Sequence, residues 1–233
     1  MLTVGSGNEA QRREWVKRKL QDLPAGLRIL DAGAGEQQFR EFCAHLHYVS
    51  QDFGEYDPRK NASSLQMPSW DYGKLDYICD IASIPEADAS FDAIMCTEVF
   101  EHLPDPLPAL KEFSRLLKDG GTLILTAPFC SLTHFAPFHF STGFNRYWYE
   151  HHLGAHQLEI IELKTNGSYF EYLAQELRRL PAITERYAKR SVGRLQKVVV
   201  RAVLSLLQRS ANLDEGSHEL LCYGYHVLAR KRG

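Results

Sequence analysis

The chain has 233 residues, of which 44% are hydrophobic and 24% charged, with a formal net charge of −2. These values are ordinary for a soluble protein with a sizeable core, and the charge balance gives no reason to expect a nucleic-acid partner. The five cysteines form no CxxC pair, the N-terminus lacks the apolar core of a secretory signal, and no segment is apolar enough to span a bilayer. We therefore expect a cytoplasmic protein with reduced cysteines.

The first half of the chain alternates predicted helices with short apolar segments. A helix is expected within residues 1–24, before Pro24. Strands are predicted at 27–31, 47–52, 75–80, 91–96 and 122–128, with helices at 36–46 and 107–117 and an irregular loop at 53–73. Strands that alternate with helices indicate βαβ units and a parallel sheet.

The second half is less regular. Residues 129–156 are rich in aromatic residues and histidines, and strands are predicted at 158–163 and 221–230. Residues 170–213 are predicted to form a helical insertion or cap, broken at Pro181 and Gly193. The sequence thus predicts one α/β domain over 1–233, a Rossmann-like three-layer sandwich with a mostly parallel seven-stranded sheet and a helical insertion before the last strand.

Acidic residues and glycines follow the predicted strands. Asp31, Gly33 and Gly35 follow the first strand, Asp52 ends the second and Asp80 ends the third. Glycines let the backbone approach a ligand, and a carboxylate after the second strand suits the hydroxyls of a ribose. Each feature alone also fits an ordinary turn. Together they indicate a nucleotide-type cofactor site at one edge of the sheet.

A dinucleotide cofactor is disfavoured by one position. The fingerprint for such cofactors needs a third glycine, and Gln38 occupies that place.

The segments LDAGAGEQQ, SQDF, CDIASIPEADASFDAIMCTEVFEHLPDP and LLKDGGTLILTAPF resemble successive motifs of class I S-adenosylmethionine-dependent methyltransferases, especially the type 11 group. The resemblance covers about residues 27–129 and implies S-adenosylmethionine as methyl donor and S-adenosylhomocysteine as product. It implies donor contacts to the methionine part, ribose and adenine from Asp31, Ala32, Gly33, Gly35, Gln38, Asp52, Phe53, Asp80, Ile81, Thr97, Glu98 and Val99. Residues 131–153 are more loosely similar to methyltransferases associated with bacterial surface glycans.

The acceptor side is expected in residues 129–156. A hydroxyl acceptor must lose a proton, and histidine suits that task near neutral pH. The candidate bases are His139, His134 and His102, although any one of them alone also fits a structural role. A metal site of two histidines and a glutamate is conceivable, but no metal site is predicted, because no ligands have the tight spacing of a metal motif.

Four residues are candidates for binding the acceptor, namely Phe129, Asn145, Arg146 and Tyr147. Arg146 would suit an acidic sugar or a phosphate. The alternative is that Arg146 caps local structure and that its aromatic neighbours pack in the core.

The sequence therefore predicts an O-methyltransferase acting on a hydroxyl of a sugar or glycan precursor. The alternatives are another small metabolite or a lipid-like acceptor, and a non-catalytic donor-binding regulatory protein. Residues 186–209 are basic with an apolar stripe, which fits core packing, a homodimer face or peripheral contact with a membrane. The protein is expected to be a monomer or a homodimer.

Overall fold

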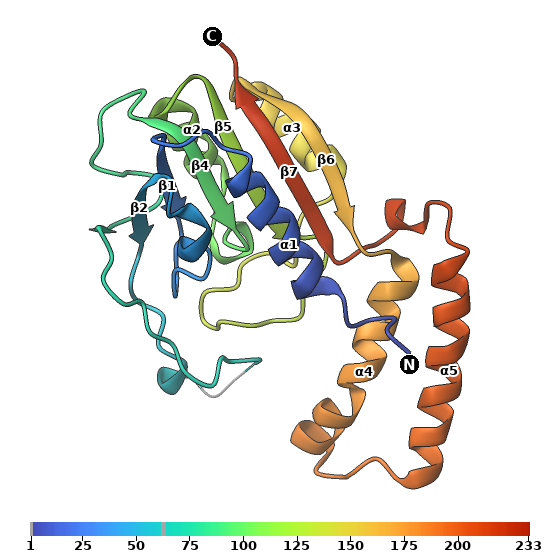
Figure 1. The fold of residues 1–233 in the computed structure, drawn as a ribbon. Helices are drawn as coiled ribbons and strands as arrows, with labels where there is room; N and C mark the ends of the chain where they lie inside the picture. The colour runs from blue at the N-terminus through green and yellow to red at the C-terminus, as the bar shows by residue number, and fades with distance from the viewer. Residues whose placement is uncertain (1, 62–63) are drawn as a thin grey trace. The chain divides into compact units, whose positions relative to one another are not determined.

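The computed structural model describes residues 2–61 and 64–233. The chain divides into two compact units (Figure 1). The sheet unit comprises Arg13–Lys164 and Gly224–Gly233, and the helical unit comprises Met1–Arg12 and Thr165–Tyr223.

A seven-stranded sheet with the order β3-β2-β1-β4-β5-β7-β6 forms the centre of the sheet unit. The strands are β1 (Arg28–Ala32), β2 (His47–Asp52), β3 (Tyr77–Ile78), β4 (Phe91–Thr97), β5 (Leu117–Pro128), β6 (Leu158–Asn166) and β7 (Gly224–Lys231). Strands β1 to β5 pair in parallel, whereas β7 runs antiparallel to β5. The predicted Rossmann-like fold with a mostly parallel sheet is confirmed.

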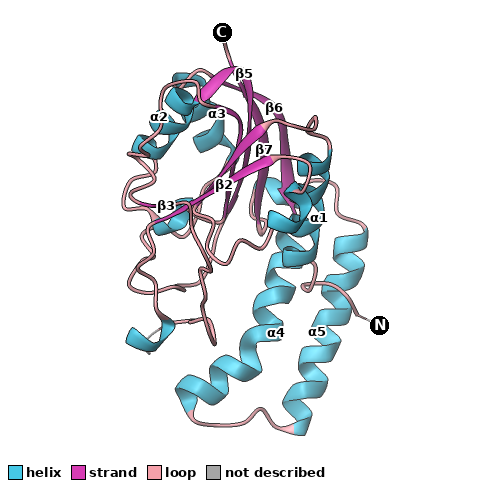
Figure 2. Cartoon of the chain, turned by 60° about the vertical axis from the view of Figure 1, so that its left-hand side comes forward, coloured by secondary structure: helices cyan, strands magenta, loops and turns pink. Residues whose placement is uncertain are grey.

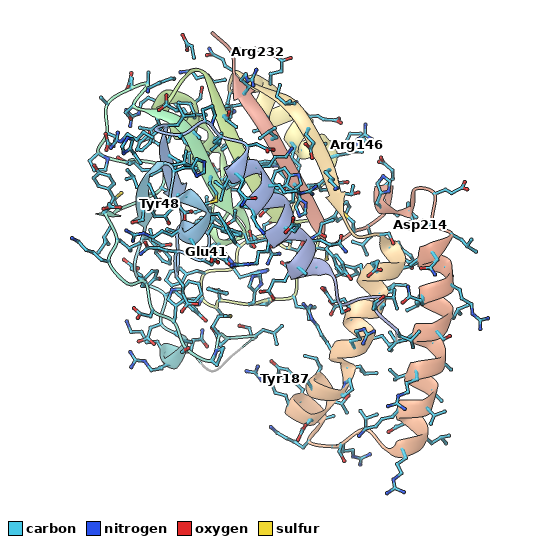
Figure 3. All side chains as sticks on the ribbon, in the orientation of Figure 1. Glu41, Tyr48, Arg146, Tyr187, Asp214 and Arg232 are labelled. Atoms are coloured by element: carbon cyan, nitrogen blue, oxygen red, sulfur yellow. The ribbon has the colours of Figure 1, made fainter. Side chains whose placement is uncertain are left out.

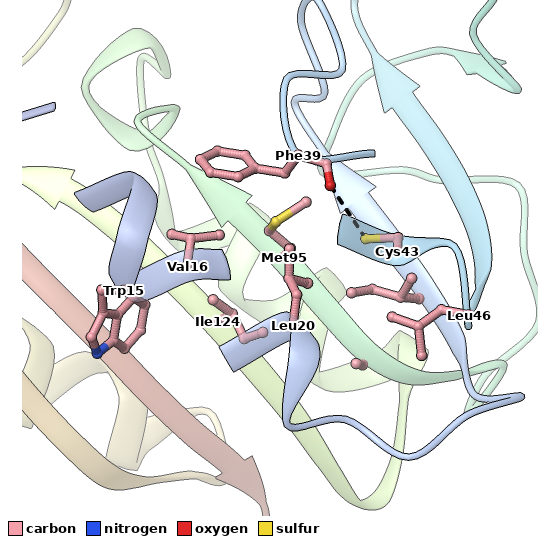
Figure 4. Packing of buried hydrophobic residues seen from close by; sticks show 10 residues of the cluster. Trp15, Val16, Leu20, Phe39, Cys43, Leu46, Met95 and Ile124 are labelled. Carbon is pink, nitrogen blue, oxygen red and sulfur yellow. Dashed lines mark hydrogen bonds between the residues drawn. The ribbon is translucent and has the colours of Figure 1, made fainter. Parts of the chain in front are cut away.

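Helices cover both faces of this sheet. Helix α1 (Asn8–Gln21) lies on one face, and α2 (Leu107–Leu116) and α3 (Arg146–Ala155) lie on the other (Figure 2). Trp15, Val16 and Leu20 of α1 are buried against Met95 and Ile124 of the sheet (Figure 4). Burial of each such side chain contributes roughly 1.5–3 kcal/mol. The apolar spacing along α1 therefore fixes this helix on the sheet.

The predicted helix at residues 36–46 is wrong. Turns lead instead into a short 3-10 helix, η1 (Arg40–Cys43). Gly35 and Gln37 have positive φ angles of 51° and 56°, which a right-handed helix cannot contain. Phe39 and Cys43 still point into the core, so the apolar spacing reflected burial rather than an α-helix (Figure 4).

Other boundaries also differ from the prediction. Strand β3 is shorter, β5 begins earlier, at Leu117, and β7 begins later, at Gly224. Pro181 does not break its helix. Proline removes one backbone hydrogen bond from a helix but does not prevent the chain from continuing in helical geometry.

Two helices make up most of the helical unit. Helices α4 (Tyr169–Ala188) and α5 (Arg194–Asn212) lie side by side (Figures 1 and 2), and a short 3-10 helix, η4 (Ser217–Glu219), follows them. Val4, Ala174 and Leu204 are buried together in this unit. Arg178 donates hydrogen bonds to the carbonyl oxygens of Val4 and Leu2, which holds the N-terminal segment in this cluster.

Candidate active site

The glycine loop after β1 has a conformation that only glycine adopts readily. Gly33 has a φ of +75°, and a Cβ added there would lie 2.5 Å from Cγ2 of Val99. A Cβ added at Gly35 would lie 2.8 Å from the ring of Trp70. The backbone N–H groups of Gly33 and Ala34 both donate to the carbonyl of Gln51, at 2.9 and 2.8 Å. The loop is therefore fixed at the carboxyl edge of the sheet, with no space for side chains at its glycines.

Asp52 connects the end of β2 to this loop. Its Oδ2 accepts a hydrogen bond from the Gly35 N–H at 2.9 Å, and its Oδ1 accepts one from the Gly54 N–H at 3.1 Å. Burial raises the pKa of Asp52, and these backbone donors act in the opposite direction. A carboxylate is therefore held beside the glycine loop, where the sequence predicted a contact with the donor.

Asp31 is buried directly before the loop. Its Oδ2 accepts a hydrogen bond from the Tyr48 hydroxyl at 2.5 Å. Burial raises the pKa of Asp31 to about 7, the Tyr48 hydroxyl opposes this rise, and the charge of Asp52 adds to it. The charge of Asp31 therefore changes near neutral pH.

The raised pKa of Asp31 predicts a pH-dependent affinity for the methyl donor. The sequence predicts that Asp31 contacts the methionine part of the donor, whose ammonium group an ionised carboxylate attracts and a protonated one does not. As the pH falls below about 7, Asp31 becomes protonated, and the dissociation constant is expected to rise by up to about tenfold per pH unit. Calorimetric titration with S-adenosylmethionine from about pH 5.5 to 8 checks this, with Asp31→Asn expected to give weak binding with a flat profile. A wild-type affinity that does not change over this range would contradict it.

The predicted adenine side is more open. Asp80 is exposed, and its Oδ1 accepts a hydrogen bond from the Ala82 N–H at 2.9 Å. Ile81 is only 6% exposed, and Phe53 packs edge-to-face against Phe138 with ring centroids 4.9 Å apart. Asp80 and Ile81 thus follow β3, Phe53 follows β2, and their contact with adenine stays a prediction.

The remaining predicted donor residues have different surroundings. Ala32 and Thr97 are buried at the ends of β1 and β4, and Oε1 of Glu98 accepts a hydrogen bond from the Thr126 hydroxyl at 3.0 Å. Gln38 is exposed, and its carbonyl accepts a hydrogen bond from Arg13. Its neighbour Gln37 instead links the glycine loop to the next loop, because its Nε2 donates to the carbonyls of residues 72 and 74.

An aromatic cluster joins the loop after β2 to the segment after β5. Leu65 exchanges backbone hydrogen bonds with Thr133 and Phe135. Phe135 stacks on Tyr56 with ring centroids 4.3 Å apart and meets Trp70 edge-to-face at 5.0 Å. Trp70 therefore touches both the glycine loop and the predicted acceptor segment. The sequence analysis did not predict this role of Trp70. Aromatic residues in an otherwise polar loop could have indicated that the loop packs against another part of the site.

Three predicted histidines lie together beside a buried carboxylate. The ring centroid of His134 is 4.8 Å from that of His102 and 4.9 Å from that of His139. Oε1 of Glu101 lies 3.7 Å from Nε2 of His102 and 3.9 Å from Nε2 of His134. Burial, with the nearby His134, lowers the pKa of His102 to about 3, and burial also lowers the pKa of His139. These two imidazoles are therefore neutral near pH 7.

Glu101 was not singled out in the sequence, and no metal site was expected. The ligand atoms of Glu101, His102 and His134 nevertheless lie within 4.8 Å of one another. The two segments that supply them follow β4 and β5, which are neighbours in the sheet. A carboxylate directly before a histidine at a strand end was the usable signal.

The four predicted acceptor residues mainly make local contacts. Asn145 caps α3, because its Oδ1 accepts a hydrogen bond from the Trp148 N–H at 3.2 Å. Arg146 is half-exposed (Figure 3) and pairs with Glu150 at 3.2 Å. Its guanidinium lies over the ring of Tyr147, which is 64% exposed. Phe129 stacks on Tyr225 with ring centroids 6.0 Å apart. Arg146 thus makes a local contact, as the alternative interpretation expected, but Asn145 is the residue that caps α3, and Tyr147 does not pack in the core.

Comparison with known proteins agrees with this geometry. Residues 30–125 match the family model described as a methyltransferase domain. Over residues 30–125 the chain therefore resembles a methyltransferase domain, and its fold is that of class I methyltransferases. The family uses S-adenosylmethionine, which fits the glycine loop and the acidic residues at the strand ends.

Curated relatives match about half of the chain. Ubiquinone biosynthesis O-methyltransferase from Xanthomonas axonopodis pv. citri (strain 306) is 34% identical over 118 residues, covering 49% of this chain and 48% of the relative. The protein of the same name from Xanthomonas campestris pv. campestris (strain B100) is 35% identical over 104 residues, or 43% of each chain. The chain spans about half the length of the curated relatives it matches.

Solved structures share the methyltransferase fold. The cyclase SpnF has a TM-score of 0.59 and 19% identity, covering 98% of this chain and 84% of that one. Phosphoethanolamine N-methyltransferase 2 from Haemonchus contortus, in complex with S-adenosylmethionine, has a TM-score of 0.54 and 17% identity, covering 96% and 53%. Because one of these proteins is a cyclase, the reaction must be argued from the site and not from the fold.

Proposed function

We propose that the chain transfers the methyl group of S-adenosylmethionine to a hydroxyl oxygen of a small acceptor. One observation carries this proposal. The segment after β4 contacts the glycine loop through Val99 and reaches the histidine cluster one 3-10 turn later, where the His102 N–H donates to the Val99 carbonyl at 2.9 Å. The segment after β4 therefore connects the glycine loop directly to the histidine cluster, whose imidazoles can accept a proton.

The chemistry needs alignment and removal of one proton. A lone pair of the acceptor oxygen attacks the methyl carbon, and the carbon–sulfur bond breaks with its electron pair remaining on sulfur. The products are the methyl ether and S-adenosylhomocysteine, and the hydroxyl proton passes to a base. Alignment of the two reactants can supply roughly 7–11 kcal/mol. The protein's main contribution is thus to hold the acceptor in line with the donor.

His139 is the best candidate for the base. The Ser131 hydroxyl donates to the Thr142 carbonyl at 3.0 Å, so it accepts from Nε2 of His139, which lies 3.2 Å away. This arrangement leaves Nδ1 of His139 as the proton acceptor. His102 is less suitable, because a pKa of about 3 makes it a weak base near neutral pH.

Replacing His139 by alanine is expected to lower kcat about 100- to 1,000-fold, because the transferred proton loses its acceptor. Donor affinity should stay within about twofold of wild type, because His139 acts only on the acceptor. Rates are measured with labelled S-adenosylmethionine. His151→Ala on α3, where the histidine is exposed, serves as the control and should be unaffected. An unchanged rate for His139→Ala would exclude His139 as the base.

Two acceptor classes remain open to test. The sequence favours a sugar or glycan precursor, whereas the names of the curated relatives favour a hydroxylated aromatic or lipid-like acceptor. We favour the second class, because Tyr56, Trp70 and Phe135 form an aromatic cluster beside the glycine loop and the predicted acceptor segment, and such surroundings suit an aromatic or lipid-like acceptor better than a sugar. An acceptor panel with sugar nucleotides in one arm and dihydroxylated aromatic compounds in the other separates the two.

The basic segment 186–209 suits peripheral contact with a membrane surface. Helix α5 exposes a set of apolar side chains, namely Leu195, Val198, Val199, Val203 and Leu206. Basic residues of the same helix, such as Lys197 and Arg201, suit an anionic lipid surface. Among the described residues, no helix is long and apolar enough to cross a membrane. Flotation with anionic vesicles tests the contact of α5 with a membrane surface. If the protein does not bind vesicles and is a homodimer by light scattering, the apolar face of α5 is better explained as a dimer interface.

A further inference from the structure

We propose that Glu101, His102 and His134 bind one divalent metal ion of the zinc type. The three ligand atoms lie within 4.8 Å of one another, and the Glu101 side chain is only 1% exposed. Ligands that share a tetrahedral zinc ion with bonds of about 2.1 Å lie roughly 3.4 Å apart. The two separations between Nε2 and Oε1, 3.7 and 3.9 Å, are close to that value.

The hydrogen bonds of the two imidazoles set their tautomers. Nδ1 of His102 lies 2.5 Å from the Phe138 carbonyl oxygen, and Nδ1 of His134 lies 2.8 Å from the Leu132 carbonyl oxygen. A carbonyl oxygen can only accept, so each Nδ1 carries a proton and donates it. In the neutral imidazole, Nε2 then carries a lone pair, and both Nε2 atoms lie near the Glu101 carboxylate. Metal-binding histidines are typically held in this way by a second hydrogen bond.

A hydrogen-bonded ion pair explains the cluster less well. A charge-assisted hydrogen bond from an imidazolium to a carboxylate spans about 2.7–2.9 Å. The observed separations between Nε2 and Oε1, 3.7 Å for His102 and 3.9 Å for His134, are too long for that bond. They are also nearly equal, so neither histidine stands out as the donor. An ion placed between the three groups accounts for both separations at once.

The ligand types select the kind of ion. Two imidazoles and one carboxylate favour zinc and neighbouring first-row metals over magnesium and calcium, which prefer oxygen ligands. Three protein ligands also leave a coordination position open, which is typical of catalytic rather than structural zinc sites. The site is thus suited to bind a further oxygen ligand.

The role of the ion rests on the proposed function. The acceptor hydroxyl would occupy the open position, where the positive charge lowers the pKa of a bound hydroxyl. The hydroxyl proton then passes to His139, whose ring centroid is 4.9 Å from that of His134. The bound oxygen attacks the methyl carbon and sulfur keeps the electron pair of the broken bond, so the metal does not change its oxidation state. Acceptors with two adjacent hydroxyls are expected to bind best, because both oxygens can reach one ion.

The test is metal binding by the untagged protein after treatment with a chelator. Calorimetric titration with zinc chloride is expected to give one equivalent per chain, and cobalt(II) is expected to give the visible spectrum of a site with imidazole ligands. His134→Ala and Glu101→Gln should each weaken zinc binding by about 100-fold or more. His47→Ala, which removes an exposed histidine at the start of β2, should bind zinc like the wild type. Thermal unfolding checks that each variant is folded, and Glu101→Gln preserves the shape of the buried side chain.

The outcomes separate this site from the proposed function. If zinc fails to bind, or binds equally to His134→Ala and Glu101→Gln, the metal site is wrong. If the metal-free protein transfers methyl groups at the full rate, the metal has no part in the reaction, while the proposed function remains. If zinc binds in one equivalent through these residues and no acceptor is methylated, the site stands and the proposed function fails. Turnover lost with the metal and restored by zinc supports both.

Discussion

Asp52→Ala is expected to weaken the binding of S-adenosylmethionine by about 30- to 100-fold, or roughly 2–3 kcal/mol. The Asp52 carboxylate accepts hydrogen bonds from the N–H groups of Gly35 and Gly54, and the sequence predicts that it also contacts the ribose of the donor. Its removal therefore loosens the glycine loop and also removes an acceptor for the ligand. Calorimetric titration of the variant against wild type measures the change.

Two companion variants make this result specific. Asp52→Asn keeps one acceptor oxygen and should give an intermediate affinity. Asp88→Ala removes an exposed carboxylate that pairs with Arg115, and it should leave donor affinity unchanged. An Asp52→Ala protein that folds normally and binds the donor as tightly as wild type would remove Asp52 from the site.

Gly33→Ala is expected to lower the free energy of unfolding by about 2–4 kcal/mol and to abolish measurable donor binding. Two costs combine at this position. The φ of +75° penalises any residue with a Cβ, and the new Cβ would lie 2.5 Å from Cγ2 of Val99. Urea unfolding measures the loss of stability, and calorimetry measures the loss of binding.

A matched glycine separates these two costs. Gly120 has the same φ of +75°, and a Cβ added there meets nothing within 4 Å. Gly120→Ala should therefore cost only the backbone part, about 1–2 kcal/mol. Val99→Ala combined with Gly33→Ala should recover most of the difference between the two glycine variants. Equal costs for Gly33→Ala and Gly120→Ala would mean that Val99 does not constrain the loop.

The sheet and the donor side could be predicted because their signals are local. Each parallel strand is a short apolar run, and the acidic residues and glycines that follow it stand next to it in sequence. Asp31, Asp52 and Asp80 therefore mark one edge of the sheet through sequence position alone. The failed helix at 36–46 shows the limit of this reasoning, because apolar spacing reports burial, whereas the backbone follows the positive φ angles of Gly35 and Gln37.

The acceptor side could be predicted only in part because its signals are not local. Leu65 pairs with the segment around His134, and Trp70 touches both Gly35 and Phe135. No periodicity within either loop encodes such pairing. The same holds for Glu101 and His134, which meet only because β4 and β5 are neighbours in the sheet. The sequence could name the histidines, but it could not show that they share a carboxylate.

The most direct test of a methyl-donor site is a calorimetric titration of the wild-type protein with S-adenosylmethionine, S-adenosylhomocysteine and a nicotinamide dinucleotide in parallel. We expect one molecule of either methionine-derived ligand to bind per chain, no binding of the dinucleotide, and weaker binding of both ligands by Asp52→Ala. Binding without turnover of any acceptor would leave a non-catalytic donor-binding protein. Absence of binding by S-adenosylmethionine and S-adenosylhomocysteine, with the protein folded, would contradict a methyl-donor site at Asp31–Gly35.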